Sequence, residues 1–190
     1  MATFSQRILT ETGSKLTGLS HEILQVNIGN RCNQLCTHCH VQATLDSEDF
    51  MTWNIMETIL EVAEHIRPGL IDITGGAPEL NPFLPRFLEA LTERDYIIQV
   101  RTNLTVLLDS SKRGLMDLYR NLQIRLVGSF PCYIEADVDH VRGTGAFKKS
   151  IQVLKTLNKL GYGANSELEL DLVFNPENAS LPPNQAQLEE

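Results

Sequence analysis

The chain has 190 residues, of which 42% are hydrophobic, so it can bury a core of its own and suits a single domain. Its 16 basic and 24 acidic side chains give a formal net charge of −8, and no dense run of Lys and Arg is present. Because phosphate binding relies on clustered basic side chains, the composition argues against a nucleic-acid partner. No apolar stretch reaches about eighteen residues, and residues 1–20 lack the apolar region of a signal peptide, so we expect a cytoplasmic protein with no membrane partner.

Strand-like and helix-like segments alternate along the sequence. The strand-like segments are residues 23–28, 70–74, 96–101, 124–130 and 168–174. The helix-like segments are one that begins at Thr52 and stops at Pro68-Gly69, followed by 82–94, 112–121 and 147–160. This alternation is typical of an α/β domain with a parallel sheet, here with five strands. In barrels of βα units the chemistry lies at the C-terminal ends of the strands.

Three cysteines in the run 30–40, Asn-Arg-Cys-Asn-Gln-Leu-Cys-Thr-His-Cys-His, follow the first strand. A folded loop can aim Cys32, Cys36 and Cys39 at one inorganic centre, and three thiolates are one fewer than a four-iron cluster takes. One iron would then stay open to a small molecule.

Other interpretations of the cysteines remain open at this point. In a structural zinc site, His38 or His40 would complete a Cys3His tetrahedron. Free core cysteines fit less well, because the run is polar. A disulfide framework is weaker still, since Cys132 is the one further cysteine in a chain large enough to form a core.

A glycine turn follows the second strand, in the order Gly75-Gly76-Ala77-Pro78-Glu79. Together with the Cys-x3-Cys-x2-Cys spacing before it, this turn resembles the radical S-adenosylmethionine (SAM) superfamily. The resemblance implies a partial barrel of six strands, a four-iron, four-sulfur cluster on Cys32, Cys36 and Cys39, and SAM bound at the open iron. It also implies that the turn lies against the amino group of SAM, where glycine lets backbone approach closely.

Further segments are similar to the arsenosugar-biosynthesis radical SAM family, also called the radical SAM/Cys-rich domain family. They are residues 24–31, 72–82, 101–106, 131–133, 142–145 and 170–176. Members of that family usually continue into a cysteine-rich region, whereas no cysteine follows Cys132 here. We therefore expect an N-terminal extension at 1–20, a radical SAM core at 21–176, and a linker at 177–190 that begins a shortened C-terminal region. The sixth strand would be absent, leaving the fifth at an open edge.

The resemblance also implies contacts with SAM. The residues concerned are Gly75, Gly76, Glu79, Asn103, Ser129 and Asp171. Asn103 is equally suited to capping a turn, and Asp171, as a carboxylate inside an apolar strand, is expected to be buried with a partner.

Four other features are less specific. We expect Arg31 either to stabilise thiolate charge or to be a solvated loop residue. Arg101 is expected either to meet the carboxylate of SAM or to form a surface ion pair. Cys132 lies near the expected mouth, where a thiol suits trivalent arsenic, or it is a plain loop cysteine. Residues 142–145, Arg-Gly-Thr-Gly, lack the ending of a P-loop, so they fit a turn before a helix.

The family implies that a 5′-deoxyadenosyl radical from SAM is joined to a trivalent methylated arsenical. It further implies an electron donor such as flavodoxin or ferredoxin. The alternatives are a radical SAM enzyme with another substrate and a non-catalytic zinc-binding module.

Overall fold

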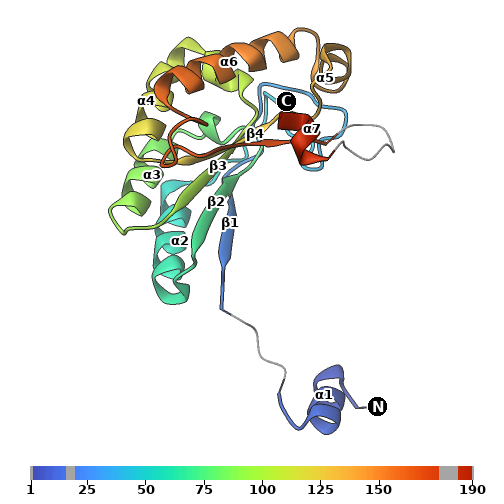
Figure 1. The fold of residues 1–190 in the computed structure, drawn as a ribbon. Coiled ribbons are helices and arrows are strands. Elements are labelled where there is room, and N and C mark those ends of the chain that lie inside the picture. Colours follow the sequence, from blue (N-terminus) through green and yellow to red (C-terminus); the bar gives the residue numbers. More distant parts are fainter. Residues whose placement is uncertain (1, 16–19, 176–183, 190) are drawn as a thin grey trace.

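The computed structural model describes residues 2–15, 20–175 and 184–189 (Figure 1). Its centre is one sheet of five parallel strands in the order β1-β2-β3-β4-β5. The strands are β1 (Ile23–Asn27), β2 (Leu70–Thr74), β3 (Ile98–Thr102), β4 (Arg125–Ser129) and β5 (Leu170–Val173). The predicted α/β class with five parallel strands, a partial barrel of the radical SAM type, is confirmed. No sixth strand occurs in the described ranges.

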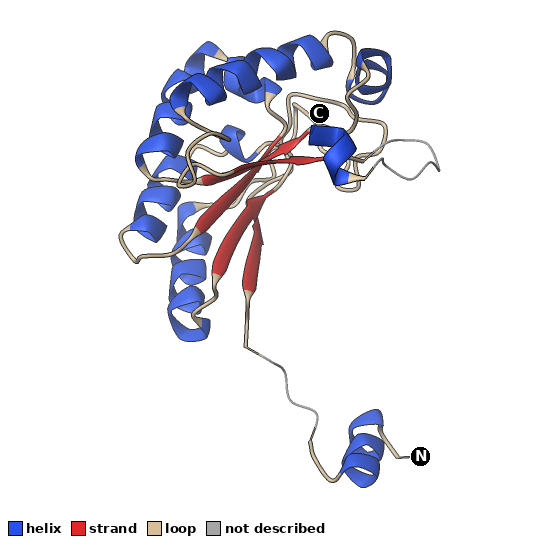
Figure 2. Ribbon diagram, in the orientation of Figure 1, coloured by secondary structure: helices blue, strands red, loops and turns tan. Residues whose placement is uncertain are grey.

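Helices lie along one side of the sheet (Figure 2). They are α2 (Trp53–Ile66), α3 (Leu84–Thr92), α4 (Arg113–Asn121), α5 (Glu135–Arg142) and α6 (Ala146–Leu160). Three short 3-10 helices complete the connections, namely η1 (Pro78–Leu80), η2 (Thr105–Leu108) and η3 (Ser110–Lys112). Two further helices are α1 (Phe4–Thr12), which has no buried residue, and α7 (Gln185–Glu189).

The sequence predicted α2, α3, α4 and α6 and missed α1 and α5, while α7 lies in the stretch 177–190 that was expected to begin a C-terminal region. The sequence of α5 is mostly acidic and basic, and its apolar face is short, with Val138 and Val141 as the buried residues. The pattern of apolar residues is therefore too weak to predict this helix. Thr52 stands at the N-cap of α2 as expected, but its side chain makes no capping hydrogen bond. The division into an extension, a core and a linker stays a prediction, and residues 176–183 fall outside the described part.

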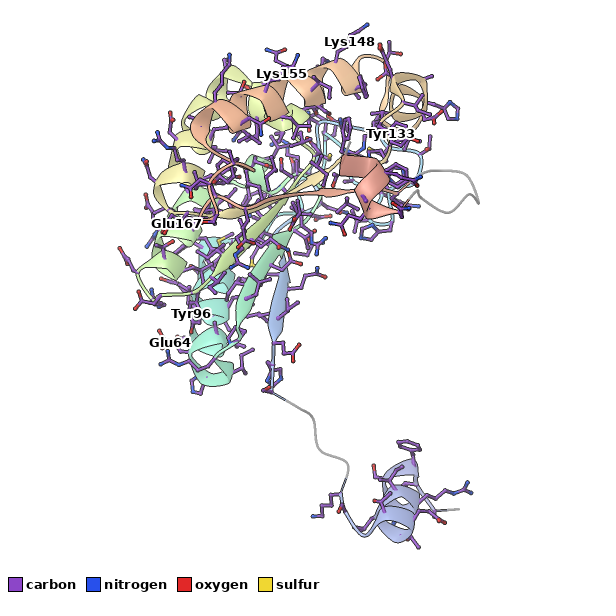
Figure 3. The ribbon with its side chains drawn as sticks, viewed as in Figure 1. Glu64, Tyr96, Tyr133, Lys148, Lys155 and Glu167 are labelled. Carbon is purple, nitrogen blue, oxygen red and sulfur yellow. The ribbon has the colours of Figure 1, made fainter. Side chains whose placement is uncertain are left out.

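The two faces of the sheet differ in chemistry. Ile98, Val100 and Thr102 of β3 are buried on the side of the helices, while Gln99 and Arg101 alternate with them on the other face. Side chains pack between sheet and helices, whereas Lys148 and Lys155 project outward from α6 (Figure 3). The face away from the helices is therefore open and carries polar side chains.

None of the helices in the described part of the chain is long and apolar enough to cross a membrane.

Candidate metal and cofactor site

The three cysteines lie on a loop that folds back on itself after β1. Backbone hydrogen bonds join Cys32 to Thr44 and Thr44 to Asn30, so the two ends of the loop run side by side. The amide of Gln34 donates to Cys32 Sγ at 3.5 Å, and the amide of Ala43 donates to Cys39 Sγ at 3.4 Å. Amide donors to sulfur stabilise a thiolate and tune the iron-sulfur cluster it ligates. The loop therefore has the features that a cluster requires of its ligands.

The thiols share one electrostatic environment. Burial raises the pKa of Cys36; the charge of Arg142 opposes this, while Cys32 and Cys39 add to it. Cys32 and Cys39 thus lie close enough to Cys36 to act on it, and all three thiols act on Arg142. In the stretches that the structure describes, no three His, Cys, Asp or Glu side chains gather closely enough to hold one metal ion.

Arg142, at the end of α5, is a cation beside the cysteines that the sequence did not predict. Its Nη1 donates to Gln34 Oε1 at 3.2 Å, and burial lowers its pKa against the opposing effect of the three thiols. Its buried Nε finds no acceptor among the described residues. Arg31, expected either to stabilise thiolate charge or to be a solvated loop residue, is exposed and donates from Nε to the carbonyl of Leu45 at 3.0 Å. The position of Arg142 depends on helix α5, and the sequence pattern of that helix did not predict it.

The glycine turn packs directly on the start of the cysteine loop. A Cβ on Gly75 would lie 2.6 Å from the carbonyl oxygen of Gly29, and one on Gly76 would lie 2.5 Å from that of Arg31. Short backbone hydrogen bonds accompany this approach, from Gly76 to Gly29 at 2.9 Å and from Ala77 to Arg31 at 2.7 Å. Glycine is needed here because the two backbones touch. The two motifs of the sequence thus form one unit.

Asn81 is a further positioning residue that the sequence analysis did not single out. Its Nδ2 donates to the carbonyls of Ile28 at 2.8 Å and Met51 at 3.0 Å, and its Oδ1 accepts from the amide of Phe83. This buried amide joins the end of β1, the loop before α2 and the segment before α3. An Asn two residues after the Gly-Gly-Ala-Pro-Glu turn was the available signal.

Asn103 connects β3 to the cysteine loop. Its Nδ2 lies 3.5 Å from Cys32 Sγ and donates to Asn33 Oδ1 at 2.6 Å, while its Oδ1 accepts from the amide of Val106. Thr105 bonds the side chains of Asn33 and Gln34 as well. Asn103 therefore performs the turn-capping role, and its contact with SAM stays a prediction.

The turn after Asn103 is strained. Leu104 has φ 67° and ψ −54°, and the amide of Thr105 bonds back to the carbonyl of Asn103 at 2.8 Å. This is a γ-turn of the rare positive-φ type, which is costly for a residue with a side chain. Its persistence beside Cys32 shows how firmly the surrounding hydrogen bonds fix this corner.

Glu79 is turned into the core rather than toward the open edge. Its side chain is 1% exposed, and it lies near Thr102 and Tyr119. Burial raises its pKa to about 7. Its predicted contact with SAM is untested.

Ser129 and Asp171 lie on the far half of the sheet. Ser129 ends β4 and is half-buried, and Asp171 in β5 is exposed. The expectation of a buried carboxylate at Asp171 is wrong, because β5 is an edge strand whose residues after Leu170 are all exposed. The structure does not bring these two side chains to the cysteine loop by any hydrogen bond among the described residues.

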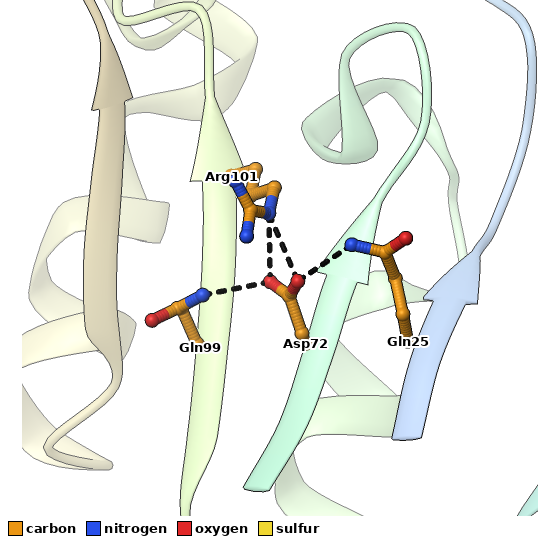
Figure 4. A network of polar contacts seen from close by, with 4 residues as sticks. All are labelled: Gln25, Asp72, Gln99 and Arg101. Atoms are coloured by element: carbon orange, nitrogen blue, oxygen red, sulfur yellow. Dashed lines mark hydrogen bonds and ion pairs between the residues drawn. The ribbon is translucent and has the colours of Figure 1, made fainter. Parts of the chain in front are cut away.

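On the open face, Asp72 is the centre of a polar network (Figure 4). It accepts from Gln25 Nε2 at 2.7 Å, Gln99 Nε2 at 2.8 Å and Arg101 Nε at 2.9 Å. Arg101 thus forms the ion pair foreseen as one of its two roles. The network fixes β1, β2 and β3 relative to one another.

Cys132 and the 142–145 turn are held by contacts within the chain. Cys132 is buried against Val138 and Ala146, and its Sγ donates to Asp137 Oδ2 at 3.4 Å. The amides of Gly145 and Phe147 donate to the carboxylate of Asp139, at 2.7 and 2.9 Å. Residues 142–145 therefore lead into α6 as predicted, and a carboxylate of the chain itself accepts from the amides at the start of that helix.

Comparison with known proteins identifies the family. The model of the Radical SAM superfamily matches residues 26–174. The chain belongs to the radical SAM superfamily. Its members use a four-iron, four-sulfur cluster and SAM, and the three cysteines, of which Cys32 and Cys39 have amide donors, fit that cofactor set.

Individual relatives are distant. A probable GTP 3′,8-cyclase of Pyrococcus horikoshii is 27% identical over 99 residues, which are 50% of this chain and 31% of that protein. A probable GTP 3′,8-cyclase of Methanothermobacter marburgensis is 31% identical over 91 residues, which are 46% of this chain and 29% of that protein. The matched part thus spans less than a third of each relative.

Among solved structures, Streptococcus suis SuiB bound to S-adenosylmethionine has a TM-score of 0.65 at 18% identity. The match covers 88% of this chain and 36% of that one. At this identity the likeness shows a shared fold.

Proposed function

We propose that this chain is the catalytic part of a radical SAM enzyme that acts on a trivalent methylated arsenical. The observation that carries the enzyme class is the unit formed by the cysteine loop and the glycine turn, in which backbone contacts at 2.7 and 2.9 Å join the two motifs. Cys32, Cys36 and Cys39 would hold the cluster, and the turn at Gly75 and Gly76 would lie beside SAM. When bound, these groups supply a 5′-deoxyadenosyl radical by one-electron cleavage of the sulfonium.

The protein's own residues position the ligands. Asn103 fixes the loop at Cys32, and the unpartnered Nε of Arg142 offers a buried donor to an anion, such as the carboxylate of SAM. Ser129 and Asp171 would meet SAM from the other half of the sheet. The polar face around Asp72 and Arg101 would border the substrate space.

For the substrate we propose dimethylarsinous acid, on the basis of the family-like segments at 72–82, 101–106 and 142–145. SAM and dimethylarsinous acid together would give methionine, a 5′-deoxyadenosyl dimethylarsine oxide and a proton. A carbon–sulfur bond breaks, a carbon–arsenic bond forms, and the electron used to open SAM is returned when trivalent arsenic becomes pentavalent. The reaction needs no general acid–base pair.

The electron would come from an acidic one-electron carrier such as flavodoxin or ferredoxin. We also propose a cytoplasmic location, because reduced thiols and a labile cluster suit that compartment.

Anaerobic reconstitution with iron and sulfide, followed by SAM and a strong reductant, tests the enzyme class. We expect a brown protein that releases 5′-deoxyadenosine, and Cys36→Ala should lose all of this product. Cys132→Ala is the matched control, because the thiol of Cys132 bonds Asp137 of α5 and is not one of the three expected cluster ligands. Zinc or no metal in oxygen-free protein would refute the enzyme class in favour of a zinc-binding module.

The substrate needs its own assay. Adding dimethylarsinous acid should replace part of the 5′-deoxyadenosine by an adenosylated arsenic product in the mass spectrum. If 5′-deoxyadenosine forms but no arsenic adduct does, the chain is a radical SAM enzyme with another substrate.

A further inference from the structure

Glu79 is a buried acid that the proposed chemistry does not use. Neither of its carboxylate oxygens makes a hydrogen bond of good geometry among the described residues, although the side chain is only 1% exposed. An ionised carboxylate without a partner in such a place is strongly unfavourable. A neutral carboxyl group that shares hydrogen bonds is the state that this site favours.

Two hydroxyl groups lie beside it. Tyr119 of α4 is fully buried, which raises the pKa of its hydroxyl, and the nearby Glu79 raises that pKa further. The hydroxyl of Tyr119 also has no hydrogen-bond partner within the described ranges. Thr102 is fully buried too, and its Oγ1 accepts from the amide of Leu104 at 3.0 Å. Its own proton remains available, and it lies near enough to lower the pKa of Glu79 in part.

These three side chains join the elements that bound the SAM site. Glu79 belongs to η1, directly after the glycine turn, and Thr102 directly precedes Asn103, which bonds Cys32 Sγ. Tyr119 comes from α4 behind them. A bond between Glu79 and Thr102 would therefore tie the glycine turn to the Asn103 turn from the core side.

We propose that Glu79 is a positioning residue for SAM, whose protonated carboxyl group bonds the hydroxyls of Thr102 and Tyr119, directly or through one internal water, and so holds the glycine turn against the Asn103 turn. This inference rests on the proposed binding of SAM. Loss of the proton would place an unpaired charge in the core and loosen the turn. The carboxyl acts through the backbone of the turn, without touching SAM.

The surroundings fix the direction of the pH effect. Burial raises the pKa of Glu79 to about 7, and Thr102, its own backbone amide and the charge of Lys112 oppose the rise. Behind Tyr119 stands Tyr162, whose hydroxyl donates to the carbonyl of Ile124 at 2.9 Å. Because the folded pKa lies above the ordinary value of 4.5, the stabilisation is complete below pH 4.5 and is lost as the pH rises through 7.

The test is the affinity of the cluster-loaded chain for SAM between pH 6 and pH 8, in wild type and Glu79→Gln. If only the protonated form binds well, the dissociation constant of wild type should rise about tenfold relative to Glu79→Gln over this range. The two dissociation constants are compared as a ratio because the α-amino group of SAM itself titrates close to this pH range. A constant ratio from pH 6 to pH 8 would overturn the proposal.

A second variant separates positioning from general damage. Tyr119→Phe removes the hydroxyl alone and should weaken SAM binding several-fold at pH 6.5. Tyr96→Phe is the matched control. The hydroxyl of Tyr96 is also buried and without a hydrogen-bond partner among the described residues. Tyr96 precedes β3, however, so it lies at the end of that strand opposite to Thr102 (Figure 3). Equal affinities for the two variants would refute the role of Tyr119.

Unfolding in denaturant needs no cofactor and reports on Glu79 by itself. The midpoint of wild type should fall between pH 6 and pH 8 more than that of Glu79→Gln. If wild type binds no SAM at any pH but this difference in midpoints is present, the proposed function fails while the buried acid is confirmed. Equal changes in midpoint would refute the buried acid itself.

Discussion

The two halves of the sheet's C-terminal edge are built differently. At β1, β2 and β3, backbone contacts join the cysteine loop to the glycine turn, and Asn103 reaches Cys32 Sγ. At β4 and β5, Ser129 is half-buried and Asp171 is exposed. One half is held by hydrogen bonds within the chain, and the other is more accessible to solvent.

This difference indicates a division of labour. A cluster with its SAM must be held in one geometry, so its protein ligands benefit from a frame that costs no reorganisation on binding. A surface that meets a substrate can take its order from that substrate. Changes in the fixed half should therefore affect stability, while changes in the open half should affect binding.

The largest loss of stability is expected for Gly76→Ala. The new Cβ would lie 2.5 Å from the carbonyl oxygen of Arg31 and 3.0 Å from the Cβ of Ala43, so backbone must shift. We expect a loss of about 3 kcal/mol, at the upper end of the overpacking range, in the free energy of unfolding by urea. Gly114→Ala is the control, because nothing lies within 4 Å of its Cβ, and it should gain about 0.5 kcal/mol in helix α4. Equal stabilities would show that the two motifs are not in tight contact.

Asp72→Ala should have the next largest effect. It removes a buried acceptor from Gln25, Gln99 and Arg101, all on the fixed half. We expect a loss of about 2 kcal/mol, the usual size for hydrogen bonds to a charged group. The comparison on the open half is the exposed ion pair of Arg125 and Glu169 at 3.1 Å, where Glu169→Ala should cost less than about 0.5 kcal/mol. Similar losses for both variants would contradict the division.

Asn103→Ala should lower the stability less than Asp72→Ala does, but it should also weaken retention of the cluster. It takes a donor from Asn33 and an acceptor from the amide of Val106. A loss of about 1.5 kcal/mol is expected, with fewer iron atoms retained after anaerobic reconstitution. Asn175→Ala, at an exposed position after β5, should retain the full iron content. Unchanged iron in both would remove Asn103 from the set of positioning residues.

The fold and the motifs could be predicted from the sequence because they are local. The alternation of strands and helices and the spacing of Cys32, Cys36 and Cys39 each appear within a short window. Arg142 and the direction of Glu79 could not be predicted in this way. Arg142 is placed by α5, whose charged sequence conceals a helix, and Glu79 turns inward because Thr102 and Tyr119 meet it from distant parts of the chain. The exposure of Asp171 likewise depends on the position of β5 at the sheet edge.

The smallest expected effect on stability is that of Ser129→Ala. Ser129 is half-buried at the end of β4, on the same face as Arg125 and Val127, and stability should stay within about 0.5 kcal/mol of wild type. If this hydroxyl contacts SAM, the dissociation constant for SAM should still rise about fivefold, the effect of one hydrogen bond of about 1 kcal/mol. Isothermal titration with cluster-loaded protein measures it. A change in binding without a change in stability would contrast with the loss of stability expected for Gly76→Ala, so the two variants together test whether the open half serves the ligand. An unchanged affinity in Ser129→Ala would leave recognition of SAM to the fixed half alone.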